Sequence, residues 1–353
     1  MARRRQSVTI KHVAADADVS LQTVSRVINN EPNVSATMKE RVEASIDKLG
    51  YVPSIAAQRM SGSRSYLILA LNDRERTIAQ WRARDGNDWV DQMLLGGMLK
   101  CAEHGYRMLI ELVDTRDDHV ERELKAAIAS LQPDGIILTP PHSHNRKIID
   151  LLVAKRIPFV RVGSRSIGEG IPVSMDDEDA ARMATMHLHG FGHTRIGFIA
   201  GAPEYKLSQW RLSGWKASMV DLDLSIEGLL AQGDFSLDSG RRAARQLLSG
   251  EDRATAIIAS NDQMAFGALK VAREMGLSVP GDVSLVSFDN SPSVRFCQPP
   301  LTAIDQPIAE MTSIAVDLII STQRGEPAPP VPVVEPARLV ERASVAPPVT
   351  KYG

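Results

Sequence analysis

Near the start of the chain, apolar residues recur every three or four positions in three short stretches, which is the spacing of an amphipathic helix. Thr9, Ser20 and Ser35 precede these stretches and carry hydroxyl groups that favour a helix N-cap, whereas Gly50 follows the third and favours a helix end. The apolar positions are Ile10, Val13, Ala14 and Ala17, then Val24, Val27 and Ile28, then Met38, Val42, Ile46 and Leu49. The pattern predicts a small domain of three helices within residues 1–51.

From Tyr66 onward, short apolar runs alternate with amphipathic stretches of helical length. This alternation is typical of parallel sheets with helices on both faces. There are more runs than one compact sheet needs, which predicts two doubly wound lobes. The runs predicted to be strands are Tyr66–Leu71, Tyr106–Leu112, Gly135–Thr139, Pro158–Val162, Ile196–Ala200, Ala256–Ala259, Ser284–Asp289 and, after a Pro-rich segment, Arg338–Arg342.

Composition adds a charge asymmetry and excludes several classes of protein. The chain has 353 residues, 43% of them hydrophobic, which is enough for a large core without disulfides. Residues 1–64 carry 10 Lys and Arg against 6 Asp and Glu, whereas the remainder carries 31 against 37, for a net charge of −2. A basic front module ahead of an acidic body predicts that the front module contacts a polyanion.

The same survey predicts a cytoplasmic protein that is not associated with a membrane. No apolar run reaches membrane-spanning length, and the charged start has no apolar run behind it of the kind a signal peptide needs. Cys101 and Cys297 have no metal-ligand spacing and are too few for a disulfide framework, which fits a reducing compartment.

The segment Thr9 to Asn29 combines two helices with a tight turn, the pattern of a helix-turn-helix. Gln22 and Arg26 are four residues apart and share one helix face. In the major groove, Gln can form two hydrogen bonds to adenine and Arg two to guanine, whereas short hydroxyl side chains suit phosphate oxygens. The alternative is a helical domain with a solvated polar face. The residues predicted to contact DNA are Leu21, Gln22, Thr23, Ser25 and Arg26.

This stretch resembles the DNA-binding domain of the lactose-repressor (LacI/GalR) family of bacterial transcription regulators. The resemblance continues to Met60 through VSATMKERVEASIDKLGYVPSIAAQRM. It covers the body through HGFGHTRIGFIAG, RLSGW, ASNDQMAFGALKVAREMGLSVPGDVSLVSFDN and PPLTAIDQPIAEM. It implies a helix-turn-helix domain at 1–51, a hinge helix and linker at 52–64, and a periplasmic-binding-protein-like body at 65–353.

Within the body, the resemblance implies one lobe of about 65–173 plus 307–331 and another of about 174–306 plus 332–345. Members of the family bind double-stranded operator DNA as homodimers and sense a small molecule, often a sugar, between the lobes. The resemblance therefore implies a DNA-binding regulator, most simply a repressor, that responds to a carbohydrate effector and has no enzymatic activity and no cofactor.

Two groups of DNA-contacting positions follow from the resemblance. Leu21, Gln22 and Arg26 fall on the family's base-reading positions. Ile55–Ser61 falls on the hinge helix, where Met60 occupies the position of the apolar side chain that wedges the central base step in the minor groove. The alternative for this segment is a flexible linker with a buried Met.

The helix-turn-helix departs from the family at two positions. Asp18 stands in the turn where the family usually has Gly, and Asp tolerates a left-handed backbone better than most residues. His12 stands where an acidic residue often completes a capping box, which predicts a weaker cap.

In the body, Arg211, Asn261 and Asp289 match positions that contact the ligand in sugar-binding members of the family. A guanidinium, an amide and a carboxylate can bracket vicinal hydroxyl groups, and Phe235 can form a hydrophobic platform for a sugar ring. Each polar residue could instead be structural, because Asp289 ends a predicted buried strand and Asn261 can cap a helix.

The predicted strand Pro158–Val162 departs from the family pattern. Gly163 follows it where the family often has an Asp that accepts a hydroxyl group. Arg161 lies inside the apolar strand, where its guanidinium must find a partner. Two interpretations remain open: Arg161 forms a buried ion pair, or it faces the cleft and favours an acidic or phosphorylated ligand.

Two further segments resemble metal or cofactor motifs. His187, His189 and His193 are closely spaced, but Gly190 and Gly192 interrupt the helix between them. The two glycines also precede a predicted strand, whereas a dinucleotide-binding fingerprint follows one. The sequence contains neither a Gly-x-Ser-x-Gly motif nor a P-loop, and no metal or cofactor is predicted.

Three alternatives remain. The same architecture could sense a non-sugar metabolite such as a purine. The chain could be an enzyme on a doubly wound fold with a basic N-terminal extension, or a periplasmic-type sugar-binding protein. The sequence identifies neither the effector and its sign nor the operator. It does not decide between dimer and tetramer, although no heptad tail follows residue 345, which favours a dimer.

Overall fold

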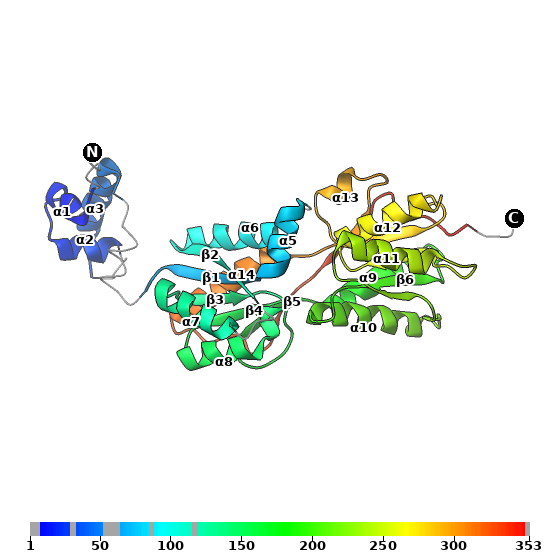
Figure 1. Cartoon of the computed structure of the whole chain (residues 1–353). Coiled ribbons are helices and arrows are strands. Elements are labelled where there is room, and N and C mark those ends of the chain that lie inside the picture. The colour runs from blue at the N-terminus through cyan, green and yellow to red at the C-terminus, as the bar shows by residue number, and fades with distance from the viewer. Residues whose placement is uncertain are drawn as a thin grey trace. The chain divides into compact units, whose positions relative to one another are not determined.

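The computed structural model describes residues 8–28, 33–51, 64–84, 86, 88–114 and 119–349, and its contacts divide into a unit up to Tyr66 and a body from Leu67 onward. The described residues of the first unit form three helices, α1 Ile10–Asp16, α2 Leu21–Ile28 and α3 Ala36–Leu49 (Figure 1). Val13, Val24 and Val42, one from each helix, are fully buried against one another. The three predicted helices are therefore confirmed.

The predicted caps shape this unit. The Ser20 hydroxyl oxygen accepts the N–H of Thr23 at 3.0 Å, and Ser35 accepts the N–H of Met38 at 3.4 Å. Asp18 has a φ of 50° and Gly50 a φ of 61°, so both adopt the left-handed backbone that a tight turn and a helix end require. The turn between α1 and α2 therefore survives the replacement of Gly by Asp.

The first helix keeps its capping box with an unusual partner. The backbone N–H of Thr9 donates to Nδ1 of His12 at 3.1 Å. An imidazole nitrogen without a proton accepts a hydrogen bond, as a carboxylate oxygen does. The contact that the sequence analysis expected to be weakened is thus present, with a ring nitrogen in place of a carboxylate.

The body contains two sheets of six strands each in its described residues (Figure 1). When the strands of each sheet are numbered from one along the chain, both sheets have the spatial order 6-5-4-3-1-2. The first sheet has the order β11-β5-β4-β3-β1-β2, and all its pairings are parallel. Helices α6 and α14 pack together on one face, and α7 and α8 pack on the other. The strands are β1 Leu67–Asp73, β2 Arg107–Val113, β3 Gly135–Leu138, β4 Phe159–Val162, β5 Ile171–Met175 and β11 Val333–Glu335.

Most helical elements of this first lobe follow its strands along the chain, whereas α14 follows β10 of the second sheet. The helical elements are α5 Arg74–Ala83, α6 Asp88–Glu103, α7 Val120–Leu131, the short 3-10 helix η1 His142–His144, α8 Arg146–Lys155 and α14 Ile308–Gln323. Strand β1 is buried from Leu67 to Asn72, as expected for a central strand that is covered on both faces.

The second lobe repeats the arrangement with the order β12-β10-β9-β8-β6-β7, and only β12 is antiparallel to its neighbour. Helices α11 and α12 pack against each other, as do α9 and α10. The strands are β6 Ile196–Ala200, β7 Leu230–Gln232, β8 Ala256–Ala259, β9 Ser284–Asp289, β10 Thr302–Asp305 and β12 Arg338–Val340. The helices are α9 Asp177–Gly190, α10 Lys206–Asp221, α11 Leu237–Leu248, α12 Asp262–Glu274 and α13 Ser293–Phe296.

All eight predicted strands occur, and four further strands were not predicted. These are β5, β7, β10 and β11. Strands β7 and β11 have only three residues each, and β10 closely follows two prolines. The expected assignment of 332–345 to the second lobe is wrong at its start, because β11 pairs with β5 in the first sheet and only β12 joins the second.

Three chain segments join the lobes: β5 to α9, β10 to α14, and β11 to β12. In a doubly wound sheet, ligands bind at the carboxyl ends of the parallel strands, near the point where the strand order reverses. Residues that follow the carboxyl ends of strands in both sheets line one common cavity. The topology therefore assembles a single cleft from two strand edges. No helix in the described residues is both long and apolar enough to cross a membrane.

Candidate functional site

The second helix, α2, presents its predicted DNA-contacting residues on one face. Leu21, Gln22 and Arg26 are exposed, whereas Val24 and Val27 on the opposite face are buried in the core. A recognition helix must expose such side chains to reach base edges. The structure thus brings the three predicted base-reading residues together on a solvated face.

The predicted phosphate-contacting residues flank this face. Thr23 and Ser25 are half-buried, and the hydroxyl of Thr23 is hydrogen-bonded to that of Ser20 at 2.9 Å within the N-cap of α2. The Thr23 hydroxyl therefore has a structural contact as well as its predicted contact with phosphate. The segment Ile55–Ser61, including Met60, lies outside the described residues, and its role stays a prediction.

In the body, the cleft between the lobes contains a cavity with an empty volume of about 650 Å³, part of it open to solvent. Four of the five residues predicted to bind a ligand, Arg211, Phe235, Asn261 and Asp289, line it. The remaining lining residues are Asn72, Asp73, Arg76, Thr77, Gln80, Trp89, Val90, Pro140, Tyr205, Leu207 and Gln306.

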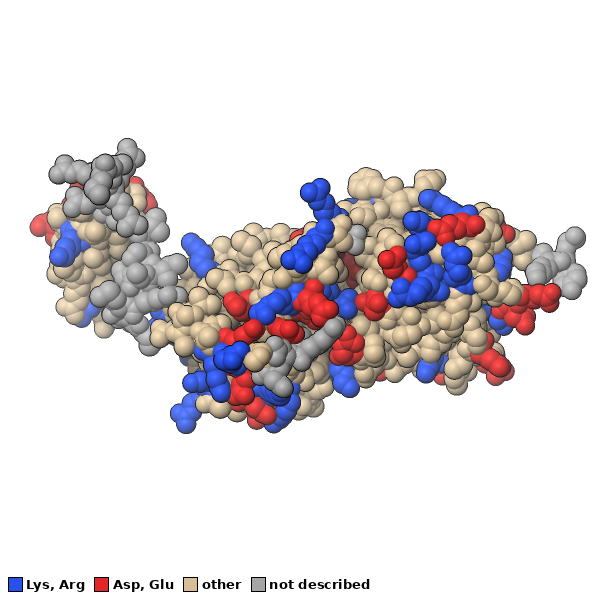
Figure 2. Space-filling view, viewed as in Figure 1, with Lys and Arg blue, Asp and Glu red and all other residues tan. Residues whose placement is uncertain are grey.

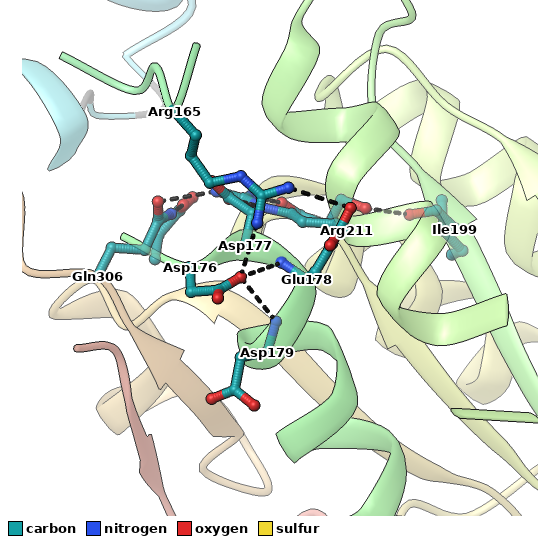
Figure 3. A network of polar contacts seen from close by, with 10 residues as sticks. Arg165, Asp176, Asp177, Glu178, Asp179, Ile199, Arg211 and Gln306 are labelled. Carbon is teal, nitrogen blue, oxygen red and sulfur yellow. Dashed lines mark hydrogen bonds and ion pairs between the residues drawn. The ribbon is translucent and has the colours of Figure 1, made fainter. Parts of the chain in front are cut away.

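Arg211 lies at the centre of a buried polar network (Figure 3). Its Nε donates to Asp177 at 2.8 Å, one Nη donates to the backbone oxygen of Ser260 at 2.8 Å, and the other donates to Gln306 at 2.8 Å. Asp177 and Gln306 stand where the first two segments cross between the lobes. Arg211 therefore links two of the connecting segments as well as lining the cavity.

Asp289 continues this network toward a second carboxyl group. The Gln306 amide donates to one oxygen of Asp289, and the backbone N–H of Asp262 donates to the other at 3.4 Å. Burial and the neighbouring Asp289 raise the pKa of Asp262 to about 8, and burial also raises the pKa of Asp289. The pair therefore holds fewer than two negative charges at neutral pH.

A third carboxyl group reaches this region from the first lobe. Burial raises the pKa of Asp88, at the start of α6, to about 6, and the nearby carboxylates of Asp289 and Asp305 contribute. Like charges that approach across the cleft disfavour ionisation of each other. Three carboxyl groups with raised pKa values therefore lie near one another at this end of the cleft, and the guanidinium groups of Arg76 and Arg211 line the same cavity.

Asn261 and Phe235 are tied to each other. The Asn261 side-chain oxygen accepts the N–H of Met264 at 2.9 Å as the N-cap of α12, and its amide donates to the backbone oxygen of Phe235 at 3.0 Å. Asn261 therefore has the structural role of a helix cap and also lies in the wall of the cavity, where it can contact a ligand. Phe235 has a φ of 68°, and its ring meets that of Tyr205 edge to face at 5.5 Å.

The prediction that Arg161 forms a buried ion pair is wrong. Arg161 is buried, but its guanidinium donates to the hydroxyl of Ser164 at 3.1 Å and to the backbone oxygen of Ser166. In the described residues no carboxylate pairs with it, and burial lowers its pKa. The loop that follows β4 supplies neutral oxygen acceptors instead. Arg161 also does not line the cavity, which removes the argument for a phosphorylated ligand.

The part of the site that the first lobe contributes was not predicted from the sequence. Asp73, Arg76 and Trp89 line the cavity, as do Tyr205 and Gln306 from the second half of the chain. One signal was available, because Asp73 follows an apolar strand and could have been placed at the carboxyl end of β1. Nothing in the spacing singles out Arg76 among its charged neighbours.

Of the clustered histidines, His193 stabilises the fold of the second lobe. His193 is buried and hydrogen-bonded to Thr255 at 2.9 Å, Ser284 at 3.0 Å and the backbone oxygen of Ala346 at 2.9 Å. In the part of the chain that the structure describes, no three His, Cys, Asp or Glu side chains are grouped so that they could hold a metal ion. On the face of the body in Figure 2, acidic and basic side chains are intermingled over both lobes.

A helix-turn-helix unit and a two-lobed body with a polar cleft define a ligand-responsive DNA-binding regulator rather than an enzyme. A family model described as "Bacterial regulatory proteins, lacI family" matches residues 9–54, and one described as "Periplasmic binding protein-like domain" matches residues 185–345. The chain is 34% identical over 344 residues to the HTH-type transcriptional regulator MalR of Streptomyces coelicolor, with 95% of each chain covered. The chain therefore belongs to the LacI family of bacterial regulatory proteins and is a transcription regulator.

Two solved structures support the same assignment. The transcriptional regulator CelR–cellobiose complex is 29% identical with a TM-score of 0.71 and covers 96% of this chain and 99% of its own. The Lac repressor dimer bound to operator and the anti-inducer ONPF is 27% identical with a TM-score of 0.77 and covers 97% of this chain and 100% of its own. The similarity thus extends over both units of the chain.

Proposed function

We propose that this regulator is a homodimeric repressor that binds double-stranded operator DNA and responds to an uncharged small molecule, a sugar or sugar derivative, in the cleft. The observation that carries the proposal is the convergence of Arg211, Asn261 and Asp289 beside Phe235 in one cavity at the carboxyl ends of two sheets. Among the similar structures, CelR is in complex with cellobiose and the Lac repressor dimer is bound to operator. These relatives support a sugar effector and an operator as the two ligands.

For DNA binding, we assign base contacts to Leu21, Gln22 and Arg26 and phosphate contacts to Thr23 and Ser25. In this proposal, residues 1–51 form the DNA-binding domain, and residues 52–64 connect it to the body at 65–353, with Met60 as the minor-groove wedge. A cytoplasmic location, on the nucleoid when the protein is bound to DNA, follows from this function.

The charge of the cleft supports an uncharged effector. Asp73 and Asp289 line the cavity, and Asp88 lies close enough to Asp289 for their charges to interact. Of the two guanidinium groups that line the cavity, that of Arg211 is already paired with Asp177, and that of Arg76 donates to the Tyr205 hydroxyl and the Asp234 backbone oxygen. Hydroxyl groups can donate to these carboxylates, whereas an anionic ligand would be repelled by them. A purine remains the second candidate, because the rings of Trp89, Tyr205 and Phe235 line the same cavity.

The homodimer is supported by an exposed apolar face on α6. Leu95, Met98 and Leu99 are 52%, 54% and 60% exposed, and their spacing places them on one side of the helix. Leu109 on the adjacent edge strand β2 is 37% exposed. An apolar patch of this kind on a soluble body marks an interaction surface, and a second copy of the chain would cover it.

The test uses the full chain in two steps. Selection from a random duplex library should enrich a two-fold symmetric site. A thermal-shift screen with neutral sugars, sugar phosphates and purines should then show stabilisation by a neutral sugar, because a ligand of the native state raises the melting temperature. The stabilising compound should change operator affinity. Enrichment of no sequence would contradict the DNA-binding assignment, and stabilisation only by purines or phosphates would contradict the sugar assignment.

A further inference from the structure

Arg76 extends from α5 in the first lobe across the cleft to the second lobe. Its Nε donates to the Tyr205 hydroxyl at 3.0 Å, and one Nη donates to the backbone oxygen of Asp234 at 2.9 Å. Its Cζ lies 4.9 Å from the centroid of the Tyr205 ring and 5.0 Å from that of the Phe235 ring. A guanidinium is attracted to aromatic faces at such distances. One side chain thus bridges the lobes through two hydrogen bonds and two rings.

Asp73 fixes the base of this bridge. One carboxylate oxygen of Asp73 accepts the backbone N–H of Arg76 at 3.0 Å as the N-cap of α5. The other accepts the Tyr205 hydroxyl at 3.1 Å, and burial raises the pKa of Tyr205, so this hydroxyl stays a donor. Asp73, Arg76 and Tyr205 therefore form a closed ring of contacts between the lobes.

The bridge forms part of the wall of two hollows. The inner hollow is the cavity lined by Arg211, Asn261 and Asp289. The outer hollow has an empty volume of about 930 Å³, is partly open to solvent, and shares Arg76 as a lining residue with the inner one. It is lined by Asp73, Glu75, Arg76, Ala79, Gln80, Ala83, Glu204, Asp234, Phe235, Ser236 and Gln263. Four residues line both hollows, namely Asp73, Arg76, Gln80 and Phe235.

The chemistry of the outer hollow complements that of the inner one. Glu75, Glu204 and Asp234 supply acceptors for hydroxyl groups, and Gln80 and Gln263 supply amides that both donate and accept. With Asp73, four carboxyl groups line this hollow against the one guanidinium of Arg76, which makes the hollow unsuited to an anionic group. An uncharged hydroxyl-rich unit therefore fits the outer hollow as well as the inner one.

We propose that Arg76 is a gate between the two hollows and sets the length of ligand that the cleft accepts. With Arg76 in place, the inner hollow takes a ligand of a single ring. A ligand with a second hydroxyl-rich ring reaches the outer hollow only by displacing the guanidinium from Tyr205 and Phe235. Such a ligand loses part of its binding free energy to breaking the bridge, and it frees the aromatic faces for its own rings. The proposal rests on the assignment of a neutral, hydroxyl-rich effector to this cleft.

The binding experiment compares Arg76→Ala with Arg82→Ala, which removes the same charge from an exposed position on the same helix. Calorimetry measures the affinities of glucose, cellobiose and maltose for each full-length protein. The gate predicts that Arg76→Ala raises affinity for the two-ring compounds relative to their one-ring counterparts by tenfold or more, and that Arg82→Ala leaves this ratio unchanged. Arg76→Lys should behave as Arg76→Ala, because an ammonium group cannot contact Tyr205 and Asp234 as a planar fork does.

A measurement without ligand separates failure of the gate from failure of the effector assignment. Spin labels at Lys155→Cys and Ser225→Cys, on exposed positions of the two lobes, report the distance between lobes in a Cys297→Ser background. The gate predicts that Arg76→Ala lengthens or broadens this distance and that Arg82→Ala does not. An unchanged distance, or an unchanged ratio of affinities where probes bind, would overturn the gate. If none of the sugars binds any variant, the sugar assignment fails. The distance between the two spin labels then tests by itself whether Arg76 is a gate.

Discussion

At the scale of single residues, the cleft keeps carboxyl groups close together, and their ionisation is linked to folding. Asp262 has its pKa raised to about 8 by burial and by Asp289. The unfolded chain ionises this group near pH 4, so the folded state holds more protons between about pH 4 and 8. The free energy of unfolding therefore falls as pH rises through this window, with a limiting slope of about 1.4 kcal/mol per pH unit.

We predict that Asp262→Asn flattens this slope between pH 6.5 and 8. An Asn oxygen can still accept the N–H of Ser291, which Asp262 accepts at 2.8 Å. The window avoids the titration of His142, His144 and His193, because burial of these rings lowers their pKa values below the usual 6.5. Urea unfolding followed at several pH values measures the slope. An Asn variant with the pH dependence of the native protein would show that Asp262 is ionised in the folded state.

Arg26 offers a second test at this scale. It is exposed on the face of α2 that also presents Gln22. If it forms two hydrogen bonds to guanine, Arg26→Ala should cost about 1–3 kcal/mol on operator DNA and relax the preference at one base pair per half-site. Affinity for random DNA should change little. An equal loss on operator and on random duplexes, measured by fluorescence anisotropy, would reassign Arg26 to the backbone phosphates.

Some residue roles could be predicted from the sequence, and the reasons are local. Ser35 and Gly50 act within one helix, so spacing alone located them. Arg161 shows the limit, because its partners lie in the loop after its strand and no rule on apolar strands distinguishes a carboxylate from a carbonyl oxygen. Arg76 was missed because its partners, Tyr205 and Asp234, are more than a hundred residues away in the chain.

At the scale of elements, the amphipathic and alternating patterns located the helices of the first unit and eight of the strands, because these depend mainly on burial of one face or of a whole strand. The missed strands depend on their neighbours instead. Strand β5 contains Pro172 and β11 has only three residues, so each is defined mainly by its pairing within the sheet. Pairing between β5 and β11 joins segments about 160 residues apart, which no local pattern reports.

The exposed face of α6 gives a prediction about assembly. Leu99→Glu places a charge in the apolar patch with Leu95 and Met98, and a dimer that buries this patch would have to desolvate the carboxylate. The variant should therefore be monomeric at concentrations where the native protein is dimeric, with the fold intact by circular dichroism. Val220→Glu, on α10 of the second lobe and 70% exposed, is the matched control. Analytical ultracentrifugation measures the oligomeric state of both variants. If Leu99→Glu dimerises as strongly as the native protein, this face of α6 is not the dimer interface.

At the scale of the whole molecule, the network around Arg211 connects the ligand cavity to the segments that join the lobes. Asp177 precedes the body of α9, Gln306 precedes α14, and Arg211 on α10 binds both. A ligand that contacts Arg211 or Asp289 would thus act on the connections that set the angle between lobes. Coupling between an effector and DNA requires a difference in ligand affinity between two such arrangements.

Because Arg211 belongs to this network, Arg211→Ala changes the stability of the body as well as the ligand site. Asp177 and Arg211 are both buried, and removing the guanidinium leaves the Asp177 carboxyl without its ion-pair partner. Breaking a buried pair in this way costs about 3–5 kcal/mol. We therefore predict that Arg211→Ala strongly destabilises the body, and that Arg211→Ala with Asp177→Asn recovers part of the loss, because the neutral amide needs no counter-ion. The coupling between Arg211 and Asp177 is measured by chemical denaturation of the native protein, of each single variant and of the double variant. Strictly additive effects would show that the pair does not hold the connecting segments together.

Effector response measured in the folded double variant then tests ligand binding by Arg211 separately from its structural role.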